Sequence, residues 1–288
     1  MISQAGIVVM RLLARFPLRW VRGLGWLLGW LLYGLARSRR RVVWANLQLC
    51  FPEWSQAQVG AAARATFVHF AQAWLDRSWL WHGSEQVLRK RLRLHGALHE
   101  LQGRQPVVVF APHFVGLDAG WTSLALEIAR PLVTIYSNQA DPVLDGWILR
   151  GRKRFGQTRL FGRDDGLKPV VRAIQQGQIL YLLPDMNIKR QESVFVPFFG
   201  VPTATLTSLS RFAVLGRARV VPVTTLMNPG GYAVQVRQAW SDFPTDDLVA
   251  DAATMNERLE DWIGEAPTQY YWVHKRFKAR PAGEPSVY

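Results

Sequence analysis

The chain has 288 residues, of which 49% are hydrophobic and 19% charged, and this composition excludes disorder over most of its length. Its length allows one large α/β domain or two modest ones. The 35 Lys and Arg residues against 21 Asp and Glu give a net charge of +14, which favours an anionic partner such as nucleic acid, anionic lipid, a phosphorylated substrate or an acidic protein. A single cysteine, Cys50, excludes an intramolecular disulfide and a Cys-x-x-Cys redox or metal site.

Residues 1–44 combine tryptophan, leucine and arginine in a helical pattern. Four arginines recur there at three- and four-residue intervals: Arg11, Arg15, Arg19 and Arg22. On one continuous helix this spacing can place them on one face, with apolar side chains opposite. The longest charge-free run, Gly23–Ala36, is shorter than the roughly 20 residues that a spanning helix needs. We therefore predict amphipathic or hydrophobic helices lying in the membrane interface, held by the basic cluster 37–41. A single N-terminal span over residues 6–36 and a buried hairpin are the alternatives.

The rest of the chain indicates one α/β domain. Ser55 and Gln58 form a capping-box pattern that predicts a helix running to about Trp81. From residue 106, segments that read as helices alternate with short apolar or β-branched runs: Pro106–Ala111, Leu132–Tyr136, Ile179–Leu183 and Arg219–Leu226. Such alternation predicts a largely parallel, mixed sheet flanked by helices. We expect a single domain over residues 45–280, preceded by the membrane-associating segment 1–44 and followed by a flexible tail, 281–288.

The stretch "APHFVGLD" (111–118) is the first candidate for chemistry. His113 follows an expected strand and lies in a loop at the carboxyl end of the sheet, where open α/β sheets bind ligands. Asp118 begins a helix expected over Leu117–Ala129. If His113 precedes that helix, Asp118 can accept a hydrogen bond from one ring nitrogen while the other nitrogen takes a proton from a hydroxyl group. An incidental polar pair is the alternative interpretation.

Other nucleophile and metal patterns are weaker. The sequence has no Gly-x-Ser-x-Gly motif, and Cys50 suits a small buried thiol. His95 and His99 are four residues apart, but Gly96 weakens a helix there and no acidic ligand stands at a fixed spacing. No metal or organic cofactor is expected.

Five segments, in order, resemble the bacterial lipid A biosynthesis acyltransferases, the late lauroyl/myristoyl branch of the lysophospholipid acyltransferase superfamily. They cover about residues 1–280 and read "RRRVVWANLQLCFPEWS", "APHFVGLDAG", "FGRDDGLKPVVRAIQQGQILYLLPD", "VFVPFFGVPTATLTSLSRFA" and "EAPTQYYWVHKRFKAR". The second of them matches the family's catalytic motif, a histidine followed after four residues by an acid.

The resemblance implies a glycerolipid-acyltransferase-like fold and an O-acyltransferase of lipopolysaccharide biosynthesis at the cytoplasmic face of the cell inner membrane. A fatty acyl group would pass from acyl carrier protein (acyl-ACP) to a hydroxyl of an acylated, phosphorylated lipid A precursor. His113 would be the general base and Asp118 would orient it and stabilise its charge, without a covalent intermediate. The implied partners are acyl carrier protein, the anionic glycolipid acceptor and inner-membrane lipid, but no nucleic acid.

The resemblance also assigns substrate-binding residues. Arg163 stands where the superfamily contacts a substrate phosphate, and a surface arginine is the alternative. Asp185 would orient a basic residue or a substrate hydroxyl. The family's Asp-Gln-Asp run here reads Asp185-Met186-Asn187, so Asn187 leaves the role of the second acid in doubt. The residues implied in lining the acyl pocket are Phe198, Phe199 and Gly200, and Thr205, near the start of the next helix, is implied in substrate binding. Core packing is the alternative for all four.

Two rival functions stay open. An acyltransferase of the same fold could use a lysophospholipid or an ornithine-type lipid as acceptor, with acyl-CoA as donor. A protein of another class would bind membranes or nucleic acid without catalysis, although no zinc finger, RRM or helix-turn-helix signature is present. The basic run Arg150–Arg172 suits sugar phosphates and an acidic carrier protein alike.

Overall fold

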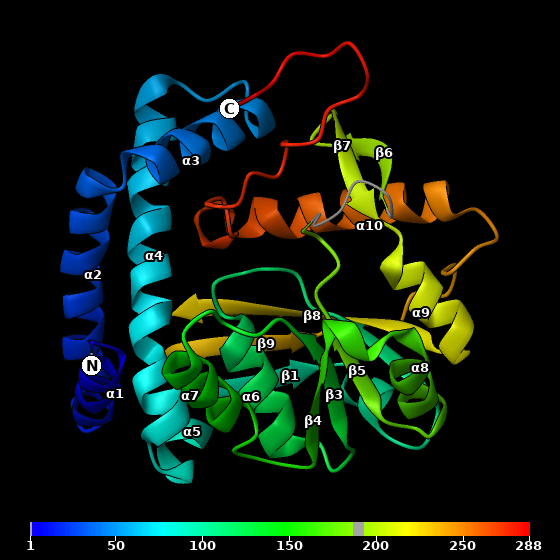
Figure 1. Cartoon of the computed structure of the whole chain (residues 1–288), viewed down its shortest axis with the longest axis horizontal. Helices are drawn as coiled ribbons and strands as arrows, with labels where there is room; N and C mark the ends of the chain where they lie inside the picture. Colours follow the sequence, from blue (N-terminus) through cyan, green and yellow to red (C-terminus); the bar gives the residue numbers. More distant parts are fainter. Residues whose placement is uncertain (1, 187–192) are drawn as a thin grey trace.

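A seven-stranded sheet with helices on both faces forms the centre of the protein (Figure 1). The computed structural model describes residues 2–186 and 193–288. The strand order is β1-β9-β8-β2-β5-β3-β4, in which β8 and β9 pair antiparallel and every other neighbouring pair is parallel. The strands are β1 (Leu92–Gly96), β2 (Val107–Phe110), β3 (Leu132–Tyr136), β4 (Thr158–Gly162), β5 (Ile179–Leu182), β8 (Arg219–Asn228) and β9 (Gly231–Val236). The predicted α/β class with a largely parallel, mixed sheet is confirmed.

The sheet is covered on both faces because its central strands are apolar on both. In β2, Val108 and Phe110 belong to one buried cluster, while Val107 and Val109 belong to another on the opposite face. The helices that surround the sheet are α5 (Glu85–Arg91), α6 (Leu117–Glu127), α7 (Pro142–Arg152), α8 (Leu167–Gln175), α9 (Ser208–Gly216) and α10 (Leu248–Glu265). Short 3-10 turns are η1 (Leu98–Leu101), η2 (Arg163–Asp165) and η4 (Pro267–Gln269).

The chain begins with four helices outside the sheet, and the second and fourth of them pack closely side by side (Figure 1). They are α1 (Ile2–Leu13), α2 (Leu18–Leu35), α3 (Arg37–Cys50) and α4 (Gln56–His82). The predicted capping box of Ser55 and Gln58 opens α4. Gly25 and Gly29 let α2 approach α4, because a Cβ atom on Gly29 would lie only 2.5 Å from the Cα atom of Val68.

A buried carboxylate joins α2 and α4 to the sheet. Asp76 of α4 is fully buried and accepts hydrogen bonds from Arg22 Nη2 (3.0 Å), the Tyr232 hydroxyl (2.8 Å) and Trp79 Nε1 (2.8 Å). The Arg22 guanidinium also donates to the backbone carbonyls of Asn228 and Gly231 at the β8–β9 turn. Arg22 therefore ties the N-terminal helices to the sheet.

The outer side of the first two helices exposes large apolar side chains. We call this the N-terminal apolar face, and it consists of Val8, Val9, Leu12, Phe16, Trp20, Leu24, Trp26, Leu27, Trp30, Leu31 and Leu35. Among the helices of the described residues, none is both long and apolar enough to cross a membrane.

A separate two-stranded hairpin, β6 (Ser193–Phe198) and β7 (Val201–Leu206), stands beside α10 (Figure 1). Its turn consists of Phe199 and Gly200, whose φ angles are +49° and +72°. A glycine adopts a positive φ readily, whereas an aromatic residue does so only under constraint. The Phe199 ring packs against Phe51 and Trp272, which supply that constraint.

Candidate active site

His113 and Asp185 meet at the carboxyl edge of the sheet. They follow β2 and β5, which are parallel neighbours, so the ends of these two strands lie together. The backbone N–H of His113 donates to Asp185 Oδ2 at 2.9 Å, and ring atom Nδ1 lies 2.7 Å from Asp185 Oδ1. One carboxylate therefore fixes both the loop and the imidazole ring.

The C-terminal segment holds this carboxylate in place. The buried Tyr270 hydroxyl donates to Asp185 Oδ2 at 3.0 Å, and the N–H of Tyr271 donates to the carbonyl of His113 at 3.1 Å. Phe114 and Tyr270 also form an isolated β-bridge. The conformation of the His113 loop thus depends on contacts from residues about 150 positions later in the chain.

The charge state of Asp185 fixes the tautomer of His113. Burial alone would raise the pKa of Asp185, but the charge of His113 and the hydrogen bonds from its ring and backbone N–H hold that pKa below its ordinary value. An ionised Asp185 accepts a hydrogen bond from Nδ1–H, which leaves the lone pair of a neutral imidazole on Nε2. The side chain of His113 is 23% exposed and lines a cavity.

Asp118 takes different partners from those that the sequence predicted. Arg77 Nε of α4 donates to its Oδ2 at 2.8 Å, and Arg77 Nη2 forms an ion pair with the same oxygen at 2.7 Å. Arg152 Nε of α7 donates to its Oδ1 at 2.8 Å, and Arg152 Nη2 forms an ion pair with that oxygen at 2.8 Å. Burial raises the pKa of Asp118, and the charges of Arg152 and Arg77 more than offset this, so that the pKa lies below its ordinary value. The expected hydrogen bond between His113 and Asp118 is absent, because both carboxylate oxygens face the two guanidinium groups and Asp185 occupies Nδ1 of the imidazole.

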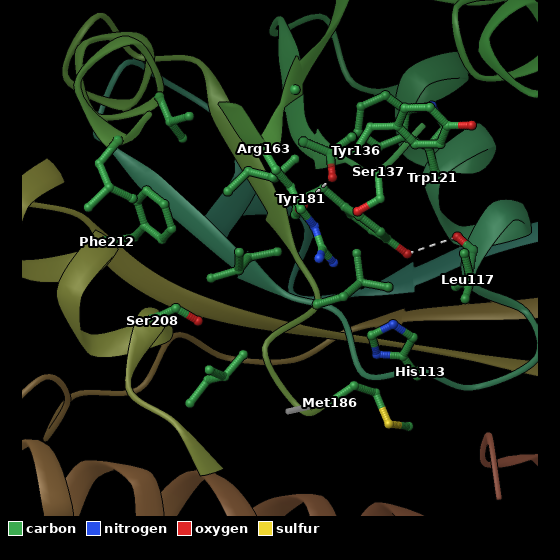
Figure 2. A pocket seen from close by; sticks show the side chains of 18 of the residues that line it. His113, Leu117, Trp121, Tyr136, Ser137, Arg163, Tyr181, Met186, Ser208 and Phe212 are labelled. Carbon is green, nitrogen blue, oxygen red and sulfur yellow. Dashed lines mark hydrogen bonds between the residues drawn. The ribbon is translucent and has the colours of Figure 1, made fainter. Parts of the chain in front are cut away.

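A cavity of about 590 Å³ opens beside His113 (Figure 2). It lies over the carboxyl ends of β3 and β5, between α6, α8 and α9. Its wall contains many apolar or aromatic side chains: Leu117, Trp121, Ile135, Tyr136, Leu167, Val170, Tyr181, Leu182, Leu183, Met186, Leu206, Phe212 and Leu215. Polar side chains that share the wall with His113 are Asp118, Thr134, Ser137, Gln139, Arg152, Arg163, Thr207, Ser208 and Arg211. Such a wall suits an amphiphilic anion with a long apolar part.

Arg163 lies where a substrate anion can reach it. It lines the cavity, is exposed, and its guanidinium makes no hydrogen bond or ion pair with a described residue. In Figure 2 its side chain points into the cavity. The structure therefore brings Arg163, His113 and Asp118 to one cavity, with Asp185 directly behind the imidazole.

The residues predicted on the hairpin lie elsewhere. Phe199, Gly200 and Thr205 are not among the described residues that line the cavity. Thr205 is buried and accepts hydrogen bonds from Asn256 Nδ2 (3.0 Å) and Arg276 Nη2 (3.2 Å). These contacts support the hairpin, and contact of the three residues with substrate stays a prediction. Asn187 lies outside the described residues.

Several site residues were not singled out from the sequence. Arg77 and Arg152 hold Asp118, Tyr270 holds Asp185, and Arg211 and Phe212 line the cavity. Arg152 did fall within the predicted basic run, Arg211 and Phe212 within the fourth resembling segment and Tyr270 within the fifth, but no spacing rule distinguished them. Within the part of the chain that the structure describes, no three His, Cys, Asp or Glu side chains gather closely enough to hold a metal ion.

The fold and the site together define a class of protein: an α/β protein whose histidine–carboxylate pair lies beside a largely apolar cavity at the carboxyl edge of its sheet. The sequence profile of the bacterial lipid A biosynthesis acyltransferases matches residues 1–279. The chain belongs to this family.

Relatives of known name resemble almost the whole chain. A lipid A biosynthesis acyltransferase of Haemophilus influenzae is 31% identical over 284 residues, which is 97% of this chain and 88% of that protein. The lipid A biosynthesis myristoyltransferase of Escherichia coli is 33% identical over 88% of this chain and 80% of its own length. The lauroyltransferase of the same organism is 29% identical over 98% and 93%. A solved 1-acyl-sn-glycerophosphate acyltransferase from Thermotoga maritima is 11% identical, with a TM-score of 0.40 over 85% of this chain and 97% of that one.

Proposed function

We propose that the protein transfers a fatty acyl group from acyl carrier protein to a hydroxyl of an acylated, phosphorylated lipid A precursor, with His113 as general base. The observation that carries this proposal is the pairing of His113 with Asp185 beside the apolar cavity. Family membership supports the lipid A acceptor, and the excess of arginine in the cavity wall supports an anionic substrate.

The proposed reaction needs no covalent enzyme intermediate. Nε2 of His113 takes the proton of the acceptor hydroxyl as its oxygen attacks the thioester carbonyl. A C–O bond forms, the C–S bond breaks, and the proton passes from His113 to the departing thiolate. Asp185 keeps the proton on Nδ1 throughout and stabilises the transient imidazolium, because its carboxylate contacts that nitrogen directly.

Asp118 has a different part in this proposal. Because its two oxygens bind Arg77 and Arg152, it fixes the Arg152 guanidinium in the cavity wall and joins α6 to α4 and α7. Asp185 thus takes the orienting role that the sequence had assigned to Asp118. Arg163 is available to bind a substrate phosphate, because none of the described residues occupies it.

We further propose that the N-terminal apolar face docks the protein on the cytoplasmic face of the inner membrane, where the acceptor lipid resides. Exposed tryptophan and leucine side chains beside arginines suit the headgroup layer of an anionic bilayer.

The proposed reaction is tested with purified protein, acyl carrier proteins bearing different chains, and a tetra-acylated lipid A precursor. We expect wild type to add one acyl-chain mass by mass spectrometry and His113→Ala to add none while retaining its circular dichroism spectrum. Transfer by a folded His113→Ala variant would remove the assignment of the base. Absence of transfer by wild type from every carrier-protein donor would remove the proposed donor.

A further inference from the structure

The cavity reaches solvent beside α8 and α9. Its exposed lining residues are Gln139, Arg163, Gly166, Leu167, Arg211 and Leu215. Three of these belong to α8 and α9, with Leu167 at 52% and Leu215 at 47%, so the two helices form one side of the mouth. The two helices lie side by side, since Gln175 Nε2 of α8 donates to the Leu215 carbonyl of α9 at 2.9 Å. A substrate that enters the cavity from this side passes over both helices.

The outer surface around this mouth is basic and apolar without an acidic residue on either helix. We call it the α8–α9 face, and it consists of Leu167, Lys168, Arg172, Arg211, Val214, Leu215 and Arg217, all exposed. The nearest acids in sequence are Asp164 and Asp165 in η2, and Asp165 is held by the N–H of Gly162. Cations with apolar side chains between them form a surface that complements an acidic, amphipathic partner.

The cations of this face have no side-chain partner among the described residues. Lys168, Arg172, Arg211 and Arg217 make no side-chain hydrogen bond or ion pair with any residue in the described ranges. By contrast, Arg22, Arg77 and Arg152 are held by carboxylates. Arginines that stabilise this fold are thus paired, whereas those of the α8–α9 face are free to pair with a partner.

The position of this face distinguishes a protein partner from a membrane. The N-terminal apolar face lies at one end of the molecule's longest axis and α8 and α9 lie at the other (Figure 1). When the first of these faces contacts a bilayer, the second points away from it. An anionic partner that reaches the α8–α9 face must therefore be soluble.

We infer that the α8–α9 face docks the acidic carrier protein that delivers the acyl thioester, so that the carrier's prosthetic arm enters the cavity beside the two helices. This inference rests on the proposed function, whose donor it places on the surface. It predicts that the face contributes to donor binding and not to chemistry, since Lys168, Arg172 and Arg217 do not line the cavity.

The test is the triple variant Lys168→Glu/Arg172→Glu/Arg217→Glu, compared with wild type and with the control Lys90→Glu/Arg93→Glu/Arg104→Glu. The control makes the same charge change at exposed residues of α5, β1 and the loop before β2, which likewise have no side-chain hydrogen bond or ion pair among described residues. Each protein is assayed with an acyl carrier protein donor and with a small acyl-pantetheine thioester, which needs no docking surface. Binding of the carrier protein is measured in parallel by surface plasmon resonance.

We expect the test variant alone to raise the KM for the carrier-protein donor about tenfold or more at low salt, with kcat and the small-thioester rate unchanged. Equal KM values for all three proteins, with wild type transferring from the carrier protein, would overturn the docking surface and leave the proposed function intact. No transfer from any carrier protein by wild type would overturn both. If the triple variant instead lost binding to anionic phosphatidylglycerol vesicles and kept its binding to the carrier protein, the face would be assigned to a membrane. That result would also overturn the inference.

Discussion

At the scale of single residues, the site has two carboxylates with different partners, and Asp185, not Asp118, contacts the histidine. Asp185 binds the imidazole of His113, and Asp118 binds two guanidinium groups. The chemical consequences differ. Loss of Asp185 frees the histidine ring to adopt the other tautomer, whereas loss of Asp118 leaves two cations without their shared anion.

We predict that Asp185→Asn lowers kcat about 100-fold or more and leaves the KM for the acyl donor nearly unchanged, because the amide cannot stabilise an imidazolium. Steady-state kinetics measures both quantities. Asp185→Glu should recover part of kcat, which a purely structural role would not require. Asp164→Asn, an exposed carboxylate outside the cavity lining, is the control and should behave as wild type.

The pKa of Asp118 predicts a pH-dependent contribution to stability. Because its pKa is lower in the folded protein than its ordinary value of 3.8, the carboxylate stabilises the fold fully above that value. The contribution is lost as the pH falls through the lowered folded value. We therefore expect Asp118→Asn to unfold about 3 kcal/mol more easily than wild type near pH 7, with the difference narrowing on acidification to about pH 3.

Urea unfolding followed by tryptophan fluorescence gives this difference at each pH. A constant difference between Asp118→Asn and wild type across the same range would show that the lost contact is not ionic.

At the scale of elements, the packing of α2 on α4 depends on the absence of side chains at two positions. We predict that Gly29→Ala lowers the free energy of unfolding by about 1–3 kcal/mol, because its Cβ would meet the backbone of Val68. Gly23→Ala on the same helix has nothing within 4 Å and should stabilise the protein by about 0.5–1 kcal/mol. Thermal denaturation of both variants measures the contrast, and equal melting temperatures would contradict it.

Much of the fold could be predicted from apolar runs alone. The runs expected at 132–136 and 179–183 are β3 and β5 nearly to the residue, and the helix expected after Gly116 is α6. Among the strands of the seven-stranded sheet, those at 92–96, 158–162 and 231–236 were not predicted. The strands at 92–96 and 158–162 lie at the sheet edges, and each contains an arginine that shortens its apolar run. Edge strands carry a weaker hydrophobic signal than central ones.

The site was harder to predict because the partner of His113 is not the acidic residue nearest to it in the sequence. His113 and Asp118 are five residues apart and suggest a pair, whereas Asp185 is separated from His113 by 72 residues. The sequence did contain a useful signal, since both His113 and Asp185 follow predicted strands. Only the order of those strands in the sheet, in which β2 and β5 are neighbours, makes them meet. Tyr270 could not be assigned at all, since no strand precedes it directly.

At the scale of the whole molecule, the two substrates would approach from opposite ends of the longest axis (Figure 1). We predict that Leu27→Glu/Leu31→Glu, on the N-terminal apolar face, abolishes flotation with anionic lipid vesicles but preserves transfer to acceptor lipid in detergent micelles. The matched control is Val214→Glu/Leu215→Glu on α9, where the exposed fractions are similar. Equal flotation of both variants would contradict the proposal that the N-terminal apolar face contacts the membrane.

The Arg22 contact limits how the protein can be divided. Its guanidinium forms an ion pair with the buried carboxylate of Asp76 and donates hydrogen bonds to two backbone carbonyls at the β8–β9 turn. A truncation that removes α1 and α2 would leave the buried carboxylate of Asp76 without its arginine partner. It would also expose the side of α4 on which α2 packs. The N-terminal helices therefore help to form the interior of the protein, and we expect a fragment without α1 and α2 to lose stability.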